Sequence, residues 1–183
     1  MSEPIGPGAS RVGLTVVAYT AWNAVSGVVY PRGIARLSDT FNNWADAFIP
    51  LEAARFIDPA SGQAEAQAHG TLLLPRHEIL LIHEASADAG PPQGGAEEMR
   101  VQKQVLFVQA RLGPYRVGGT LYLPQYATLL SYLNRAEEVF LPLTNATIVS
   151  TVGERPREVR VPFVLVCHSR LLVHEARVGG TVG

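Results

Sequence analysis

The chain has 183 residues, 47% hydrophobic and only 17% charged, with a formal net charge of −1. Soluble domains carry about 25% charged residues, so we expect some apolar surface here to meet a protein partner or another copy of the chain. Lysine occurs once, at Lys103, and no dense basic run is present. Proteins that track a phosphate backbone show a basic stripe, so nucleic acid is excluded as an expected partner.

The first residues, 1–11, are rich in glycine and proline and are predicted to be a tail. They lack the basic segment and the apolar segment of a secretory signal. No later stretch approaches the roughly 20 apolar residues of a membrane span. The only cysteine, Cys167, lies in an apolar run and is expected to behave as a small buried hydrophobe. Together these features predict a cytoplasmic protein with no membrane span.

The chain repeats itself. Shifted by 92 positions, residues 27–54 match residues 119–146 without a gap, and nine of the 28 pairs are identical where chance gives about two. The identical pairs include Gly27/Gly119, Leu37/Leu129, Asn42/Asn134, Phe48/Phe140 and Pro50/Pro142. Residues 77–85 match residues 168–176 at an offset of 91, with six of nine pairs identical. We therefore predict a tandem duplication.

The boundaries follow from this alignment. It predicts a first module at 12–85, a linker at 86–103, a second module at 104–177 and a C-terminal tail at 178–183. The change of offset is expected in the loops 58–70 and 150–161, because loops tolerate a change of length better than strands do.

Each module begins with two predicted strands. Residues 14–20 and their counterpart 106–112 form the first strand, and the second strand runs over 24–30 and 116–123, where apolar side chains alternate. Gly27 and Gly119 fall inside the second strand. A glycine in that position indicates a bulge or a close approach of another backbone.

A short helix and three more elements follow. Leu37, Phe41 and Trp44 have helical spacing. Phe48 and Phe140 then start a third strand, and the prolines two residues later indicate an edge or a strand start, since proline has no N–H for the ladder. The module closes with a predicted hairpin, 70–74 with 78–85 and 159–166 with 170–177, with His77 and His168 in the tight turns.

The expected fold class is mainly β. We predict two tandem copies of a small antiparallel half-barrel or SH3-like roll, each with one short helix, packed with pseudo-twofold symmetry. Such packing would bury the apolar face that one small module leaves open.

A local pattern supports the repeated unit. Leu37-Ser38-Asp39-Thr40-Phe41-Asn42 is followed by Phe48-Ile49-Pro50-Leu51, and the second copy has Asn134, then Phe140-Leu141-Pro142-Leu143-Thr144-Asn145-Ala146. This resembles a group of small bacterial β-rich domains of unknown activity, which carry Leu-Ser-Asp-x-Leu-Asn and then Phe-Leu-Pro-Leu-Thr-Asn-Ala. The first copy keeps Ser38-Asp39 and the second keeps Thr144-Asn145. The resemblance implies a fold unit and no chemistry.

The repeated His-Glu pairs are the most prominent polar pattern. His83-Glu84 and His174-Glu175 occupy matching positions. A zinc site needs three or four converging ligands, and no further ligand accompanies either pair, so strand-end structural residues are the favoured interpretation. Arg32 and Arg36, with His77 and His168, are the weaker candidates for a small-ligand site. The sequence predicts no catalytic residue and no cofactor.

The leading functional hypothesis is a non-catalytic structural or protein-interaction module, a subunit of a larger bacterial assembly or oligomer. A small-ligand or nucleotide sensor with its pocket near Arg32, Arg36 and the turn histidines is the first alternative. A metal-dependent enzyme at the His-Glu pairs is the second.

Overall fold

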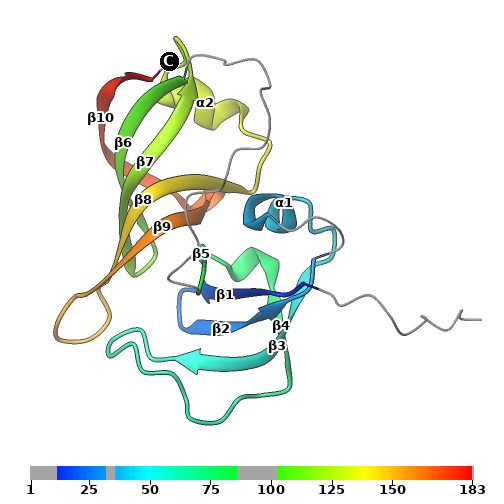
Figure 1. Cartoon of the computed structure of the whole chain (residues 1–183). Helices are drawn as coiled ribbons and strands as arrows, with labels where there is room; N and C mark the ends of the chain where they lie inside the picture. The colour runs from blue at the N-terminus through cyan, green and yellow to red at the C-terminus, as the bar shows by residue number, and fades with distance from the viewer. Residues whose placement is uncertain (1–11, 32–35, 86–102, 183) are drawn as a thin grey trace, which may run out of the picture.

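The computed structural model describes residues 12–31, 36–85 and 103–182, and within these ranges the protein is one antiparallel ten-stranded sheet with two α-helices (Figure 1). The mainly β class is confirmed. The predicted tail 1–11, most of the predicted linker, and Arg32 lie outside the described residues.

The order of elements is the same in both halves of the chain. The first half contains β1 (Leu14–Tyr19), β2 (Ala24–Val29), α1 (Leu37–Asn42), β3 (Phe48–Ile57), β4 (Thr71–Pro75), the 3₁₀ helix η1 (Arg76–Glu78) and β5 (Leu81–Glu84). The second half contains β6 (Lys103–Leu112), β7 (Tyr115–Pro124), α2 (Leu129–Arg135), β8 (Phe140–Ser150), β9 (Arg157–Cys167), the 3₁₀ helix η2 (His168–Arg170) and β10 (Leu172–Val182).

The two halves join head to tail within one sheet, whose strand order is β10-β6-β7-β8-β9-β5-β1-β2-β3-β4. In each half the last strand pairs with the first, and the fourth lies at the opposite edge. The halves meet where β5 pairs with β9, Leu81 opposite Val166 and Ile82 opposite Leu165. A twofold axis would also pair β4 with β10, yet these are the outer strands. The predicted pseudo-twofold packing is therefore wrong.

The predicted closing hairpin is also wrong. β4 pairs with β3, whereas β5 crosses to β1, so that consecutive strands lie at opposite edges of their half. β9 and β10 behave in the same way. A 3₁₀ helix of three residues separates the two strands, so the chain does not form a tight turn and the second strand does not pair with the first. Alternation of side chains identifies a strand but not its partner, which explains the error.

The glycines at 27 and 119 have the predicted role. The pairing between β2 and β3 shifts between Ser26 and Val28, and that between β7 and β8 shifts between Gly118 and Thr120. A Cβ on Gly27 would lie 3.0 Å from the Cβ of Leu51, and one on Gly119 would lie 3.1 Å from the Cβ of Leu143. Both a bulge and a close approach are present.

The strand that pairs with the glycine at each bulge contains a strained residue. Ala53 in β3 has a φ of 50° and Asn145 in β8 has a φ of 49°. These positions correspond at the offset of 92. Asparagine tolerates the left-handed region through local hydrogen bonding, whereas alanine has no such compensation. The bulge geometry is therefore kept in the first half at a conformational cost.

The prolines lie near strand starts, as predicted. Pro50 faces Leu73 of β4, while the pairing of β3 with β2 reaches only Glu52. Pro142 has the same place in β8, where pairing with β7 reaches only Thr144. Each proline thus lies beyond the reach of one neighbouring strand, where no ladder donor is needed.

Two predicted boundaries change. β10 continues to Val182, which pairs with Lys103, so the described part of the predicted tail is strand and the end of the linker already belongs to β6. This happens because β6 starts early and offers a free edge. The change of offset from 92 to 91 does not lie in the predicted loops. The strands β4 and β9 still match each other at an offset of 92, so the second half lacks one residue only after that point, between η2 and β10. Leu80 of the first half therefore has no counterpart in the second half.

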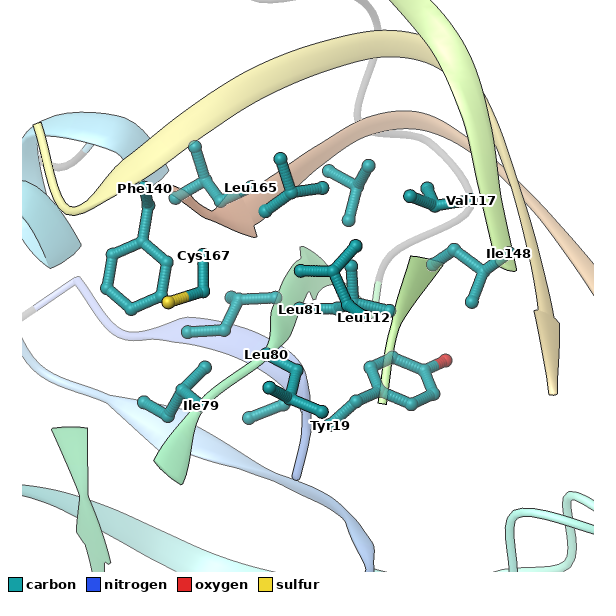
Figure 2. Close-up of a cluster of buried hydrophobic side chains, with 14 of the residues drawn as sticks. Tyr19, Ile79, Leu80, Leu81, Leu112, Val117, Phe140, Ile148, Leu165 and Cys167 are labelled. Carbon is teal, nitrogen blue, oxygen red and sulfur yellow. The ribbon is translucent and has the colours of Figure 1, made fainter. Parts of the chain in front are cut away.

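The core continues through the junction of the halves. Figure 2 shows Leu80 and Leu81 from the first half beside Leu112 and Leu165 from the second half. These four residues are at most 5% exposed and belong to one buried cluster. The junction is thus part of one continuous buried core.

The helices are short and packed by few residues. In α1 the side chains of Leu37 and Phe41 are buried, and the helix ends before Trp44, whose indole nitrogen donates to the Phe48 carbonyl at 3.0 Å. In α2 the Thr128 hydroxyl caps the start by accepting from the Ser131 amide. Neither helix is long and apolar enough to cross a bilayer.

Candidate functional site

Buried polar side chains gather where the two halves meet. The hydroxyl of Tyr19 lies 3.1 Å from Nε2 of His83, and Nδ1 of His83 lies 2.7 Å from the Glu84 carbonyl. A carbonyl only accepts, so Nδ1 carries the proton and Nε2 accepts from Tyr19. The ring of Tyr115, from the second half, stands edge-on to Tyr19 with centroids 5.3 Å apart. β1, β5 and β7 thus position one aromatic cluster.

Burial dominates the electrostatics of this cluster. Desolvation lowers the pKa of His83 below its ordinary value, against a raising effect of the Glu84 carbonyl. Desolvation raises the pKa of Tyr19, which nearby Arg157 partly offsets. The pKa of Tyr115 rises to about 12, because of desolvation and then of Tyr19. At neutral pH all three side chains are therefore uncharged.

The polar atoms of this cluster are mostly engaged with one another. The hydroxyl of Tyr115 is buried and has no hydrogen-bond partner among the described residues. Within those residues no three His, Cys, Asp or Glu side chains come together in a way that could hold a metal ion. His83 is 6% exposed and its ring nitrogens are both engaged, so it has no atom left for a ligand.

The two repeated His-Glu pairs occupy different environments. His83 lies opposite Val17 in a regular ladder. His174 is exposed and falls in the bulge between Val173 and Glu175, where β10 shifts against β6. The side chain of Glu175 lies outside the described atoms. The two identical His-Glu pairs of the sequence thus occupy different positions in the sheet.

The ligand-site candidates are not brought together. His77, in η1, has a side chain that is 71% exposed, with Nε2 3.3 Å from Glu78. His168 is half-buried at the start of η2, one position out of step with His77. Arg36 is exposed at the start of α1. Arg32 lies outside the residues that the structure describes.

Asn42 joins the two halves, a role that sequence reasoning missed. Its side-chain nitrogen donates to the Phe140 carbonyl at 3.0 Å, and its oxygen accepts from the Phe140 amide at 2.9 Å. Helix α1 is thereby tied to the start of β8, and the Phe41 and Phe140 rings meet edge to face at 6.3 Å. The identity of Asn42 and Asn134 was the only signal for this role in the sequence.

Large apolar side chains are exposed at both outer strands. On β4, Leu73 is 61% exposed, and on β10, Leu172 and Val178 are 70% and 68% exposed. Trp22, in the turn between β1 and β2, is 81% exposed. Large exposed apolar side chains on the outer strands of a sheet are candidates for contact with another protein.

A hollow of about 300 Å³ lies beside β4. Trp22, Leu73 and Phe56 contribute its apolar lining, and Asn23 and Glu78 contribute polar groups. Its lining includes Leu72–Pro75 of the outer strand, so that the hollow and exposed Leu73 belong to one region and form a candidate site. A larger hollow of about 590 Å³ lies over β6, β7 and β10 and is lined among others by Arg111, Arg116 and His174.

Comparison with known proteins adds no assignment: no family model matches the chain, and neither the curated proteins nor the solved structures contain a match.

Proposed function

We propose that the chain is a non-catalytic structural or protein-interaction module, built by tandem duplication of a half-barrel or SH3-like roll and acting as a subunit of a larger bacterial assembly. The exposed apolar side chains on both outer strands carry this proposal. Free strand edges are avoided in monomers by charge, proline or cover, since they pair readily with other chains. On β10 apolar Leu172 and Val178 are exposed beside charged Arg177.

The polar groups support the same proposal. Both ring nitrogens of His83 are engaged in hydrogen bonds, and His77 and Arg36 stand apart on the surface. Catalysis needs a nucleophile or base held together with an orienting group in reach of substrate. The apolar outer strands offer contact area, which is what a binding module uses.

The test is whether the full chain binds protein at all. The purified chain is measured by light scattering across a wide concentration range, and a tagged chain expressed in bacterial cells is crosslinked and its products are identified. We expect a mass above that of the monomer or a stoichiometric protein partner. A Trp22→Ser, Leu73→Ser double variant should reduce this association. A chain that stays monomeric and crosslinks to no protein would contradict the proposal.

A further inference from the structure

Each half uses one strand edge to form the head-to-tail junction, and the matching edge of the other half remains unpaired, within the described residues, at an end of the sheet. β5 and β9 pair inside the chain, and their counterparts β10 and β4 are the outer strands (Figure 1). The registers fix the correspondence: Leu73 faces Pro50 as Leu165 faces Pro142, and the first residue of β10, Leu172, corresponds to Leu81. A heterologous contact of this kind can be repeated between molecules.

Residues that the internal junction buries are exposed at these free edges. Leu81, Leu165 and Phe140 are all 0% exposed. Their counterparts Leu172, Leu73 and Phe48 are 70%, 61% and 51% exposed. The side chains stay apolar although nothing within the described chain covers them.

The polar link across the junction also has a free counterpart. Asn42 holds the backbone of Phe140, and both residues are identical in the other half, as Asn134 and Phe48. Asn134 is exposed and belongs to the half that ends in β10, while Phe48 belongs to the half that ends in β4. Each free end thus carries one member of the pair. The repeat of both residues is explained if the same link forms twice.

The hollow beside β4 has a filled counterpart inside the chain. Its lining residues Asn23, Val25 and Phe56 correspond to Tyr115, Val117 and Ile148. At the internal junction this region is covered by the first half, where the Tyr19 ring packs edge-on against the Tyr115 ring and Val117 and Ile148 are buried. The free hollow is therefore the place where the neighbouring half would lie.

We infer that the partner at this surface is a second copy of the chain: β10 of one copy adds to β4 of the next, with Leu172 opposite Leu74 and Val173 opposite Leu73, and Asn134 binds the backbone of Phe48. The inference rests on the proposed function and names its partner. The sheet then continues from copy to copy into a ring or a filament. Because Leu80 has no counterpart, this contact is smaller than the internal one, and the association depends on concentration.

Two charged variants test the inference, each blocking one edge. Leu73→Lys blocks β4 and Leu172→Lys blocks β10, while Tyr122→Lys places the same charge on an exposed residue of β7, two strands in from β10. Mass is measured by light scattering from about 1 µM to about 1 mM. We expect the wild type and Tyr122→Lys to assemble. Each edge variant should weaken assembly at least about tenfold.

Mixing the two edge variants gives the sharper result. Leu73→Lys keeps an intact β10, and Leu172→Lys keeps an intact β4, so an equimolar mixture should form heterodimers and nothing larger. A mixture that stays monomeric would overturn the inference.

A disulfide checks the register. Leu73→Cys with Val173→Cys places cysteines on directly opposed residues, at a Cα separation of about 5 Å that a disulfide can span. Oxidation should link copies into covalent ladders, while Leu73→Cys with Ala176→Cys, three residues out of register, should not. The native Cys167 is 4% exposed and does not interfere.

The failures of the two proposals are distinguishable. If the wild type assembles, but both lysine variants assemble equally well and no register-specific disulfide forms, the head-to-tail contact is wrong and the interaction module stands. If the wild type is monomeric at every concentration but binds a different protein, the inference also fails alone. If it binds no protein of any kind, both fail.

Discussion

At the scale of single residues, His83 gives the clearest dependence on pH. Burial holds its pKa below the ordinary value of 6.5, so the unfolded chain takes up the proton first as pH falls. The free energy of unfolding should therefore decrease below about pH 6.5, by up to about 1.4 kcal/mol per pH unit until the folded pKa is reached. Denaturant titrations at pH 7.5 to 5 check this.

The matched control is a histidine on the surface. His83→Gln should flatten the pH dependence, whereas His77→Gln, whose native side chain is 71% exposed, should retain it. An unchanged slope in His83→Gln would place the titration elsewhere.

The left-handed conformation of Ala53 gives a second prediction. With a φ of 50°, alanine bears a steric cost that glycine avoids, so Ala53→Gly should raise the free energy of unfolding by about 0.5–1 kcal/mol despite the greater freedom of the unfolded chain. Asn145→Gly is the comparison, because asparagine already tolerates this region and little gain is expected. Thermal and denaturant unfolding measure both. A loss of stability in Ala53→Gly would contradict the assignment of strain.

Single residues were predictable where the backbone alone imposed the requirement. Gly27 and Gly119 were predicted to mark a bulge, because a glycine inside a strand pattern is typical of a bulge or a close backbone approach. The positive φ of Ala53 was not predictable, since alanine carries no sign of it. The contact of Asn42 could not be predicted because its partner lies 98 residues away, and spacing along the chain contains no information about such a contact.

At the scale of elements, α1 is held by one side chain, and Asn42→Ala should show it. The substitution removes two hydrogen bonds and leaves the amide and carbonyl of buried Phe140 unsatisfied, so we expect a loss of about 2–4 kcal/mol in unfolding free energy. Asn134→Ala should have little effect in dilute solution, where its proposed partner is absent. Chemical denaturation of both variants measures the difference, and equal effects of the two substitutions would contradict the distinction.

The helices and strands could be predicted from the sequence, but the pairing of the strands could not. Both helices and most strand boundaries follow from local periodicity, as β1 at Leu14–Tyr19 and α1 at Leu37–Asn42 illustrate. The hairpin expected around His77 failed because a single turn of 3₁₀ helix sends β5 to β1. Such pairing depends on how the sheet curves, which no local pattern records.

At the scale of the whole molecule, the continuous core predicts one unfolding transition. Side chains of both halves share a single buried cluster, so neither half should unfold alone. Calorimetry of the Leu172→Lys variant, chosen to keep assembly out of the measurement, should give equal calorimetric and van't Hoff enthalpies. Two resolved transitions would show that the halves are independent.

The sequence predicted two similar units but the wrong relation between them. A twofold arrangement would pair β5 with β9 and also β10 with β4, whereas in the head-to-tail arrangement β5 pairs with β9 and the other two strands lie at opposite ends of the sheet. Both arrangements need the same repeated residues. The contact between β5 and β9 consists of Leu81 with Val166 and Ile82 with Leu165, too few residues to leave a pattern. The candidate surface at β4 was missed for the same reason, because an exposed leucine in a strand looks like any other.

Because the pairing between β5 and β9 is short, the covalent connection between the halves decides whether they stay together when the protein is dilute. The pairing of β5 with β9 covers two opposed residue pairs and would by itself hold separate chains together weakly, but the halves also share the Asn42 link and one buried cluster. As parts of one polypeptide they meet at an effective concentration in about the millimolar range. The inner joint is therefore insensitive to how much protein a cell contains. The proposed contact between copies has the same design but no covalent connection, so its occupancy would rise with the concentration of the protein. The same type of interface would thus be permanent within the chain and concentration-dependent between chains.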